Sequence, residues 1–299
     1  MKLSVKQATV LLAFVISARA TSFMFSKICL TSMNTFSLLA LRFSIASAVL
    51  FLIFHRRIIQ SFHKWNVCSG VIIGSVFYLV LAAEHAGLKT TPASSAAFFE
   101  NLAIIIVPFM ECVISRTLPT KKTIFVAVLA VTGVGILTLC GNNIGITSGD
   151  VFLFTAAFFY GTAIIITARL VGKGDSFVIG FWQVTTTGML AWLHIMIHGD
   201  LTMLGESSQY IMILILAVVC TSFGFTLQPV AQSKLSAETA GSFCALGPLV
   251  ASTVSCIFLH EKFTGASLTG AVLILIALAL QSGLICLRRY SVFRVGKYS

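Results

Sequence analysis

Ten long apolar segments, separated by short polar connections, limit what this chain can fold into more than any other feature. About 20 apolar residues cross the hydrocarbon core of a bilayer as a helix. The segments are continuous apolar runs rather than alternating ones, which argues against a β-barrel. The sequence therefore predicts an all-α integral membrane protein without a separate soluble domain. We expect its ten transmembrane helices near residues 7–26, 35–54, 66–87, 92–115, 121–141, 149–170, 176–198, 208–230, 236–259 and 265–287.

The composition agrees with a membrane-embedded chain. Of the 299 residues, 58% are hydrophobic and only 10% are charged, whereas a soluble protein carries about 25% charged residues. The eight cysteines are scattered and form no C-x-x-C pair, so we expect them to behave as small apolar residues. Neither a metal site nor a cofactor is expected.

The lysines and arginines predict the orientation in the membrane. If the N-terminus is cytoplasmic, most of them fall in cytoplasmic loops or helix ends, and the outer loops hold only Lys27, Lys89 and Lys262. This bias predicts a multi-pass protein of the cell (inner or plasma) membrane with both termini in the cytoplasm. The net charge of +11 then reflects the loop bias and requires no nucleic-acid partner.

The two halves of the chain resemble each other. The stretch "AGLKTTPASSAAF" (86–98) resembles "AQSKLSAETAGSF" (231–243), and pairing of the other helices at a slightly different offset places Arg42 opposite Gln183 and Arg19 opposite Tyr160. We therefore expect two five-helix repeats, 1–143 and 144–299. Because five is odd, the second repeat would enter the membrane from the opposite side. Inverted repeats of this kind are typical of transporters.

Several motifs resemble those of the EamA-type transporters of the drug/metabolite transporter superfamily. They are "ATSFMFSK" in the first helix, "LLALRF" around Arg42, and the series Pro248, Glu261 and Gly270 near the end. The first half departs from the last pattern, since Arg116 or Thr117 stands near the glutamate position. The resemblance implies ten helices in two inverted bundles around a central cavity. It also implies transport of metabolites or amino acids, most often as export.

Three charged residues are expected at one depth in the membrane. At 1.5 Å per helical residue, Arg19, Arg42 and Glu100 fall roughly 10 to 13 Å below the outer ends of their helices. A charge at that depth needs compensation, so we expect Glu100 to oppose Arg19 across a polar cavity. The alternative is an ion pair that only fixes helix packing, and this structural role is the one we expect for Arg42. The surplus positive charge favours a solute with a carboxylate.

Proton coupling would need a titrating group near this cavity. Glu100 is the preferred coupling candidate, and Glu84 and His85 are the others. The alternative for Glu84 is a surface pair with Lys89. Adjacent helical residues point in different directions, so Glu84 and His85 cannot both face the cavity squarely. The further cavity candidates are Tyr78, Asn101, Tyr160 and Gln183, with Gln228 as a weaker one.

These features predict a secondary transporter, and not an enzyme, that moves a small polar metabolite such as an amino acid by alternating access. A passive channel or facilitator and a nutrient-uptake carrier remain as alternatives, and a pH gradient that drives uphill movement would discriminate among them. An intramembrane enzyme is remote, because "HEKFT" (260–264) lacks the second histidine of H-E-x-x-H and no G-x-S-x-G elbow occurs. The expected partners are the lipid bilayer and a small-molecule substrate. The substrate, the coupling ion and the oligomeric state stay open.

Overall fold

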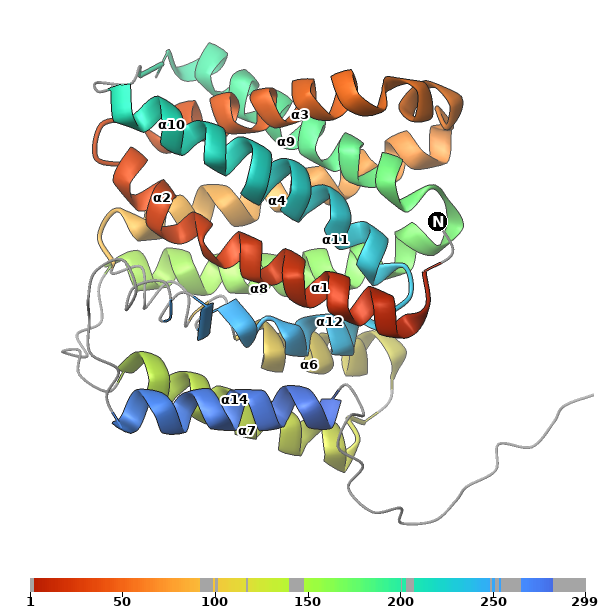
Figure 1. Cartoon of the computed structure of the whole chain (residues 1–299), viewed down its shortest axis with the longest axis vertical. Coiled ribbons are helices and arrows are strands. Elements are labelled where there is room, and N and C mark those ends of the chain that lie inside the picture. Colours follow the sequence, from red (N-terminus) through yellow and green to blue (C-terminus); the bar gives the residue numbers. More distant parts are fainter. Residues whose placement is uncertain are drawn as a thin grey trace, which may run out of the picture.

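The computed structural model is a bundle of helices that lie side by side (Figure 1). It describes residues 3–91, 99, 102–116, 118–139, 148–199, 201–202, 207–247, 249–250, 253 and 265–281, and these contain no strand. The elements of the first half are α1 (Val5–Ala20), α2 (Ser22–Cys29), α3 (Thr35–Gln60), α4 (Lys64–Leu88), α6 (Ala103–Ser115) and α7 (Lys121–Leu139). Those of the second half are α8 (Ser148–Leu170), η1 (Val171–Lys173), α9 (Ser176–His198), α10 (Ser207–Ile215), η2 (Leu216–Phe223), α11 (Gly224–Gln232), α12 (Ala237–Phe243) and α14 (Gly265–Gln281).

Helices of membrane-spanning length account for much of the described chain. Five stretches are long and apolar enough to cross a bilayer, namely Val5–Cys29, Thr35–Gln60, Lys64–Leu88, Ser148–Lys173 and Gln209–Gln232. Shorter apolar helices cover Ala103–Ser115 and Leu268–Ala277. The predicted all-helical, membrane-embedded class is confirmed. The count of ten spans stays a prediction, since parts of several expected spans lie outside the described residues.

Two expected helices are less regular than their hydropathy indicates. The first is interrupted at Thr21, whose hydroxyl donates to the carbonyl of Ala18 at 2.8 Å. The eighth contains the π-helix η2, in which the hydroxyls of Thr221 and Ser222 donate to the carbonyls five residues earlier. A wide turn of this kind is rare and often occurs at functional sites.

Short polar residues begin several helices. Asn34, Asp175 and Ser236 cap α3, α9 and α12 by accepting hydrogen bonds from backbone amides of the first turn, which satisfies donors that have no partner within the helix. We name the two ends of the bundle after two of these caps. The Asp175 end holds the start of α9 and the ends of α3 and α8, and the Asn34 end holds the start of α3.

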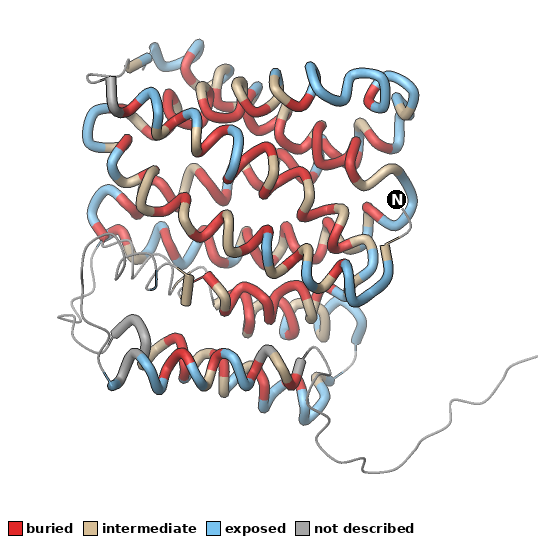
Figure 2. The backbone as a smooth tube through the Cα atoms, viewed as in Figure 1, coloured by how far each residue is buried: buried red, intermediate tan, exposed pale blue. Residues whose placement is uncertain are grey.

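The buried residues lie between the helices and form one main hydrophobic core (Figure 2). Close contact between α4 and α9 depends on small residues, as is usual between membrane helices. A Cβ atom at Gly74 would lie 2.6 Å from the carbonyl oxygen of Gln183. The two helices can therefore approach this closely only with glycine at that position.

Each half of the chain packs on the other in a reciprocal pattern. Helix α1 contacts α11 and α4 contacts α8, while α3 contacts α9, α6 contacts α12 and α7 contacts α14. If each helix of one half is exchanged for its counterpart in the other, the α1–α11 pair becomes the α4–α8 pair. The other three pairs stay the same. The α7–α14 pair lies at one edge of the molecule and the α3–α9 pair near the opposite edge (Figure 1).

Candidate functional site

Arg19 lies in the last turn of α1 and is only 7% exposed. Its Nη1 donates to the hydroxyl of Tyr160 at 2.7 Å and to Oε1 of Gln228 at 2.8 Å. Tyr160 belongs to α8 and Gln228 to α11, so a cation from the first half is held by two groups of the second. Two predicted cavity candidates, Tyr160 and Gln228, thus contact this buried charge.

Three aromatic rings surround the same guanidinium. Its Cζ lies 4.4 Å from the ring centroid of Phe225, 5.0 Å from that of Tyr160 and 5.7 Å from that of Phe77. Each ring within about 6 Å attracts the cation by roughly 0.5 to 2 kcal/mol. We call Arg19, Phe77, Tyr160, Phe225 and Gln228 the Arg19 cage.

The space beside the cage is small. A cavity of about 10 Å³ is lined by Ile16, Arg19, Ala20, Tyr160, Cys244 and Gly247. That volume holds about one water molecule. This cavity by itself is too small to hold a metabolite.

Arg42 is a second buried arginine, and it is 1% exposed. Its Nε donates to the hydroxyl of Thr221 at 2.5 Å, which joins α3 to the π-helix η2. Its Nη2 has no hydrogen-bond partner in the described structure. The charges of Glu84 and Arg19 both act on Arg42, so the three ionisable groups belong to one electrostatic unit.

Glu84 and His85 are both buried, with exposed fractions of 6% and 0%. The predicted alternative of a surface pair between Glu84 and Lys89 is therefore wrong, because only Lys89 is exposed. Nδ1 of His85 lies 2.8 Å from the carbonyl oxygen of Leu81 and donates to it. Its Nε2 has no partner in the described structure.

The remaining predicted residues are not part of the cage. The ring of Tyr78 is half-buried and lies 6.3 Å from that of Phe36, and its neighbour Phe77 faces Arg19 instead. Gln183 is fully buried where α9 packs on α4, and its side-chain amide has no partner among the described residues. Glu100 and Asn101 lie outside the described residues, so the pairing of Arg19 with Glu100 stays a prediction.

Sequence reasoning missed the two phenylalanines of the cage, Phe77 and Phe225, and also Cys244, whose Sγ lies 3.8 Å from the hydroxyl of Tyr160. Helical spacing holds a signal for both rings. Phe77 precedes Glu84 by seven residues and Phe225 precedes Gln228 by three, which places each on the same helix face as a polar candidate. Without knowledge of the packing, these two cannot be told from the other 23 phenylalanines, since the chain has 25 in all.

Polar side chains also connect the halves at the Asp175 end. Arg57 of α3 donates to both carboxylate oxygens of Asp175, at 2.9 and 3.1 Å. Burial alone would raise the pKa of Asp175, but the hydrogen bonds and charge of Arg57, with the amides of Val178 and Phe177, lower it below the ordinary 3.8. The carboxylate thus stays ionised and ties α9 to α3.

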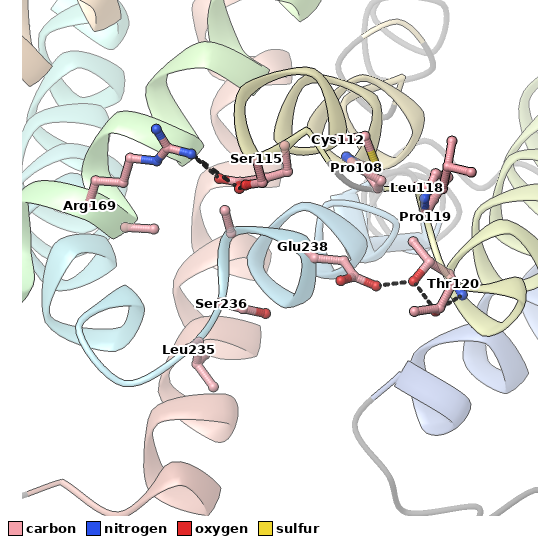
Figure 3. Close-up of a pocket in the computed structure, with 14 residues that line it drawn as sticks. Pro108, Cys112, Ser115, Leu118, Pro119, Thr120, Arg169, Leu235, Ser236 and Glu238 are labelled. Carbon is pink, nitrogen blue, oxygen red and sulfur yellow. Dashed lines mark hydrogen bonds and ion pairs between the residues drawn. The ribbon is translucent and has the colours of Figure 1, made fainter. Parts of the chain in front are cut away.

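A larger pocket of about 440 Å³ opens at the same end, between α6, α7, α8 and α12 (Figure 3). Two contacts cross from one half to the other here. Arg169 of α8 lies 3.3 Å from the carboxylate of Glu111 on α6, and the hydroxyl of Thr123 on α7 donates to Glu238 of α12. No group of three potential metal ligands occurs among the described residues.

The sequence matches the EamA-like transporter family over residues 7–139 and 147–283. The chain belongs to the EamA-like transporter family. It is accordingly a multi-pass membrane transporter of the drug/metabolite transporter superfamily, with the bilayer and a small-molecule substrate as its partners. No curated protein matches it significantly. Among solved structures, a chain described as "Crystal structure of protein" is similar to this one. The match covers 93% of this chain and 97% of the other, with a TM-score of 0.75 and 16% sequence identity, and it shows a shared fold.

Proposed function

We propose that this EamA-like protein is a secondary transporter that exports a small polar metabolite with a carboxylate group, such as an amino acid, across the cell membrane. Residues 1–143 and 144–299 would form two inverted repeats that rock against each other around the Arg19 cage. Both chain termini would be cytoplasmic, so the Asp175 end would face the cytoplasm. The lysine and arginine bias of the loops supports this orientation.

The observation that carries the proposal is a permanently charged arginine buried between the two halves. Arg19 comes from the first half, and its hydrogen-bond acceptors Tyr160 and Gln228 come from the second. Arginine binds carboxylates through paired hydrogen bonds. A solute carboxylate that enters the cage would therefore compete with Tyr160 and Gln228 for the guanidinium.

The packing of the halves supports alternating access. The reciprocal helix contacts allow either end of the bundle to separate by a related motion. The described cavity beside the cage has room for about one water, so the two halves would have to separate further to admit a solute there. Opening at the Asp175 end would require the contacts Glu111–Arg169 and Thr123–Glu238 to break.

Glu84 is the described residue best placed to couple transport to protons. It is buried, and its charge acts on Arg42. Protonation of Glu84 would remove that attraction and change the balance between the two buried arginines. His85 is the second candidate, because its buried Nε2 has no partner in the described structure and can accept a proton. Glu100 keeps its place as the candidate that the sequence predicts.

Uptake of a mixed metabolite pool into proteoliposomes, read by mass spectrometry, tests the proposal. Wild type should accumulate a carboxylate solute, and Arg19→Gln should reduce the rate by at least about tenfold because the charge-assisted bond is lost. Arg19→Lys should restore part of it. Arg56→Gln is the matched control, since Arg56 is exposed at the end of α3 and should leave transport unchanged.

An imposed pH gradient separates the mechanisms. A proton-coupled exporter should drive the solute uphill, and Glu84→Gln should retain exchange of solute for solute but lose the response to the gradient. Movement only down the solute gradient in wild type would establish the facilitator instead. Normal transport by a folded Arg19→Gln variant would exclude the cage as the binding site.

A further inference from the structure

Two buried polar side chains near the Asp175 end lack hydrogen-bond partners. Gln232, in the last turn of α11, is 2% exposed, and both its Nε2 and its Oε1 are unpaired within the described structure. Thr167 of α8 is 1% exposed, and its hydroxyl is likewise unpaired there. Buried polar groups are normally hydrogen-bonded, so such exceptions need an explanation.

Both residues continue the helix faces that form the Arg19 cage. Gln232 follows Gln228 by four residues on α11, and Thr167 follows Tyr160 by seven on α8. Residues at these spacings lie on one face of a helix. Helix α11 also contacts α8 and η1, so the ends of the two faces belong to helices that pack together.

Residues close to these two in the sequence line the pocket of about 440 Å³ at the Asp175 end. Ala168 and Arg169 of that pocket follow Thr167 directly, and Leu235 lies three residues beyond Gln232. Figure 3 shows Arg169 and Leu235 at the pocket. Thr167 and Gln232 therefore stand between this pocket and the Arg19 cage along both helices.

We infer that Thr167 and Gln232 form a second solute-binding site on the route between the pocket and the cage. The inference rests on the proposed function. When the Asp175 end opens, the solute supplies the hydrogen bonds that these groups lack in the closed conformation. An amide and a hydroxyl both donate and accept, and neither is charged. The site thus takes the hydroxyl or carboxamide of a solute on its way between the pocket and the Arg19 cage, as in a polar amino acid.

Near-isosteric amino-acid pairs test this site. Valine and threonine differ by a hydroxyl, and leucine and asparagine differ by a carboxamide. A site built to bind such a group rejects the analogue that lacks it. In proteoliposomes, wild type should carry threonine and asparagine at least about tenfold better than their partners. Gln232→Leu and Thr167→Val should abolish most of that preference while they retain transport of valine and leucine.

The midpoint of thermal unfolding gives a second measurement. If Thr167 and Gln232 stabilised the fold through hydrogen bonds, their replacement by apolar residues would lower this midpoint. Replacing an unpaired polar group by an apolar one should raise the midpoint by about 2 to 4 °C. Thr226→Val is the matched control, because the Thr226 hydroxyl is also buried and unpaired in the described structure but packs beside Gly180 of α9. It should raise the midpoint without changing the amino-acid preference.

The outcomes separate this site from the proposed function. An unchanged preference in both variants, or a lower midpoint in both, would overturn the second site and leave the Arg19 cage intact. If wild type carries none of the four amino acids, both the polar amino-acid solute proposed for this site and the proposed amino-acid transport are overturned. If the variants fold well but carry none of the four amino acids, Thr167 and Gln232 are needed for the passage of every solute. That result would also contradict a site that binds only the hydroxyl or carboxamide of the solute.

Discussion

At the scale of single residues, Arg19 is held by its carbon stem as well as by its charge. A Cβ atom at Gly224 would lie 2.8 Å from Cγ of Arg19. The hydrogen bonds to Tyr160 and Gln228 fix the other end of the side chain. The stem therefore cannot move aside without displacing the guanidinium from the cage.

We expect Gly224→Ala to lower the free energy of unfolding by about 1 to 3 kcal/mol, because it overpacks this contact, and to reduce transport. Thermal or denaturant unfolding in detergent and proteoliposome transport measure the two effects. Gly135→Ala is the control, since a Cβ there meets nothing within 4 Å and should gain up to about 1 kcal/mol. Equal behaviour of the two variants would show that the cage is loosely packed.

Asp175 predicts a pH dependence of stability. Its folded-state pKa is depressed below 3.8, so it stabilises the fold above that value, and this contribution is lost as the pH falls through the folded-state pKa. The difference in unfolding midpoint between wild type and Asp175→Asn should be constant near neutral pH and shrink toward zero as the pH falls through the depressed folded-state pKa of Asp175. Arg57→Gln should flatten the same dependence. A difference that persists at low pH would assign the effect to packing.

At the scale of elements, the π-helix η2 is the least regular part of the described bundle. It joins α10 to α11, and its Thr221 accepts the hydrogen bond from Arg42. Thr21, where α1 gives way to α2, lies beside it, with its Oγ1 3.5 Å from Sγ of Cys220. Two irregular points in adjacent helices thus meet at the level of the buried arginines, where a bend would alter the site directly.

Deletion of Val219 should convert this wide turn to a regular α-helical one. Val219 is 46% exposed, and a π turn contains one residue more than the α turn that replaces it. We expect the variant to fold with a similar unfolding midpoint but to lose transport by at least about tenfold, since Thr221 moves away from Arg42. Transport assays and thermal unfolding measure both.

Deletion of Ile211 is the control. Ile211 is exposed in the regular helix α10, so its removal rotates the preceding turn by about 100° and should lower the midpoint. Similar transport in wild type and the Val219 deletion would rule out a role for the wide turn.

At the scale of the whole molecule, two contacts join the halves beside the large pocket at the Asp175 end. Glu111 and Arg169 come from different halves and meet beside the large pocket. In a background without native cysteines, Glu111→Cys with Arg169→Cys should be joined by a short bifunctional methanethiosulfonate, which forms a disulfide with each thiol and releases methanesulfinate. We expect the link to stop transport and reduction to restore it, because alternating access requires this end to open.

The control pair is Glu111→Cys with Ser115→Cys, one turn apart on α6. A link within one helix should leave transport intact. If transport continues while positions 111 and 169 are cross-linked, the interface that moves during transport lies elsewhere in the molecule.

Much of the fold was predictable from local patterns, and part of the site was not. Asn34, Asp175 and Ser236 are short polar residues directly before apolar runs, which marks helix starts, and the observed starts agree. Tyr160 was predicted through the internal repeat. The break at Thr21 and the π turn were not, because no proline or glycine stands within either one. Their geometry follows from side-chain contacts rather than from backbone preference.

The sequence by itself determined that this is a helical membrane protein, since a bilayer requires long apolar segments whose backbone groups bond internally. It also determined that Arg19 must be compensated. Only the tertiary structure shows which groups of the second half Arg19 contacts, because Tyr160 and Gln228 are 141 and 209 residues away along the chain. The reason is physical. Apolar helices in lipid gain little from hydrophobic contact with one another, so packing shape and a few polar groups select the partners, and neither can be calculated one helix at a time.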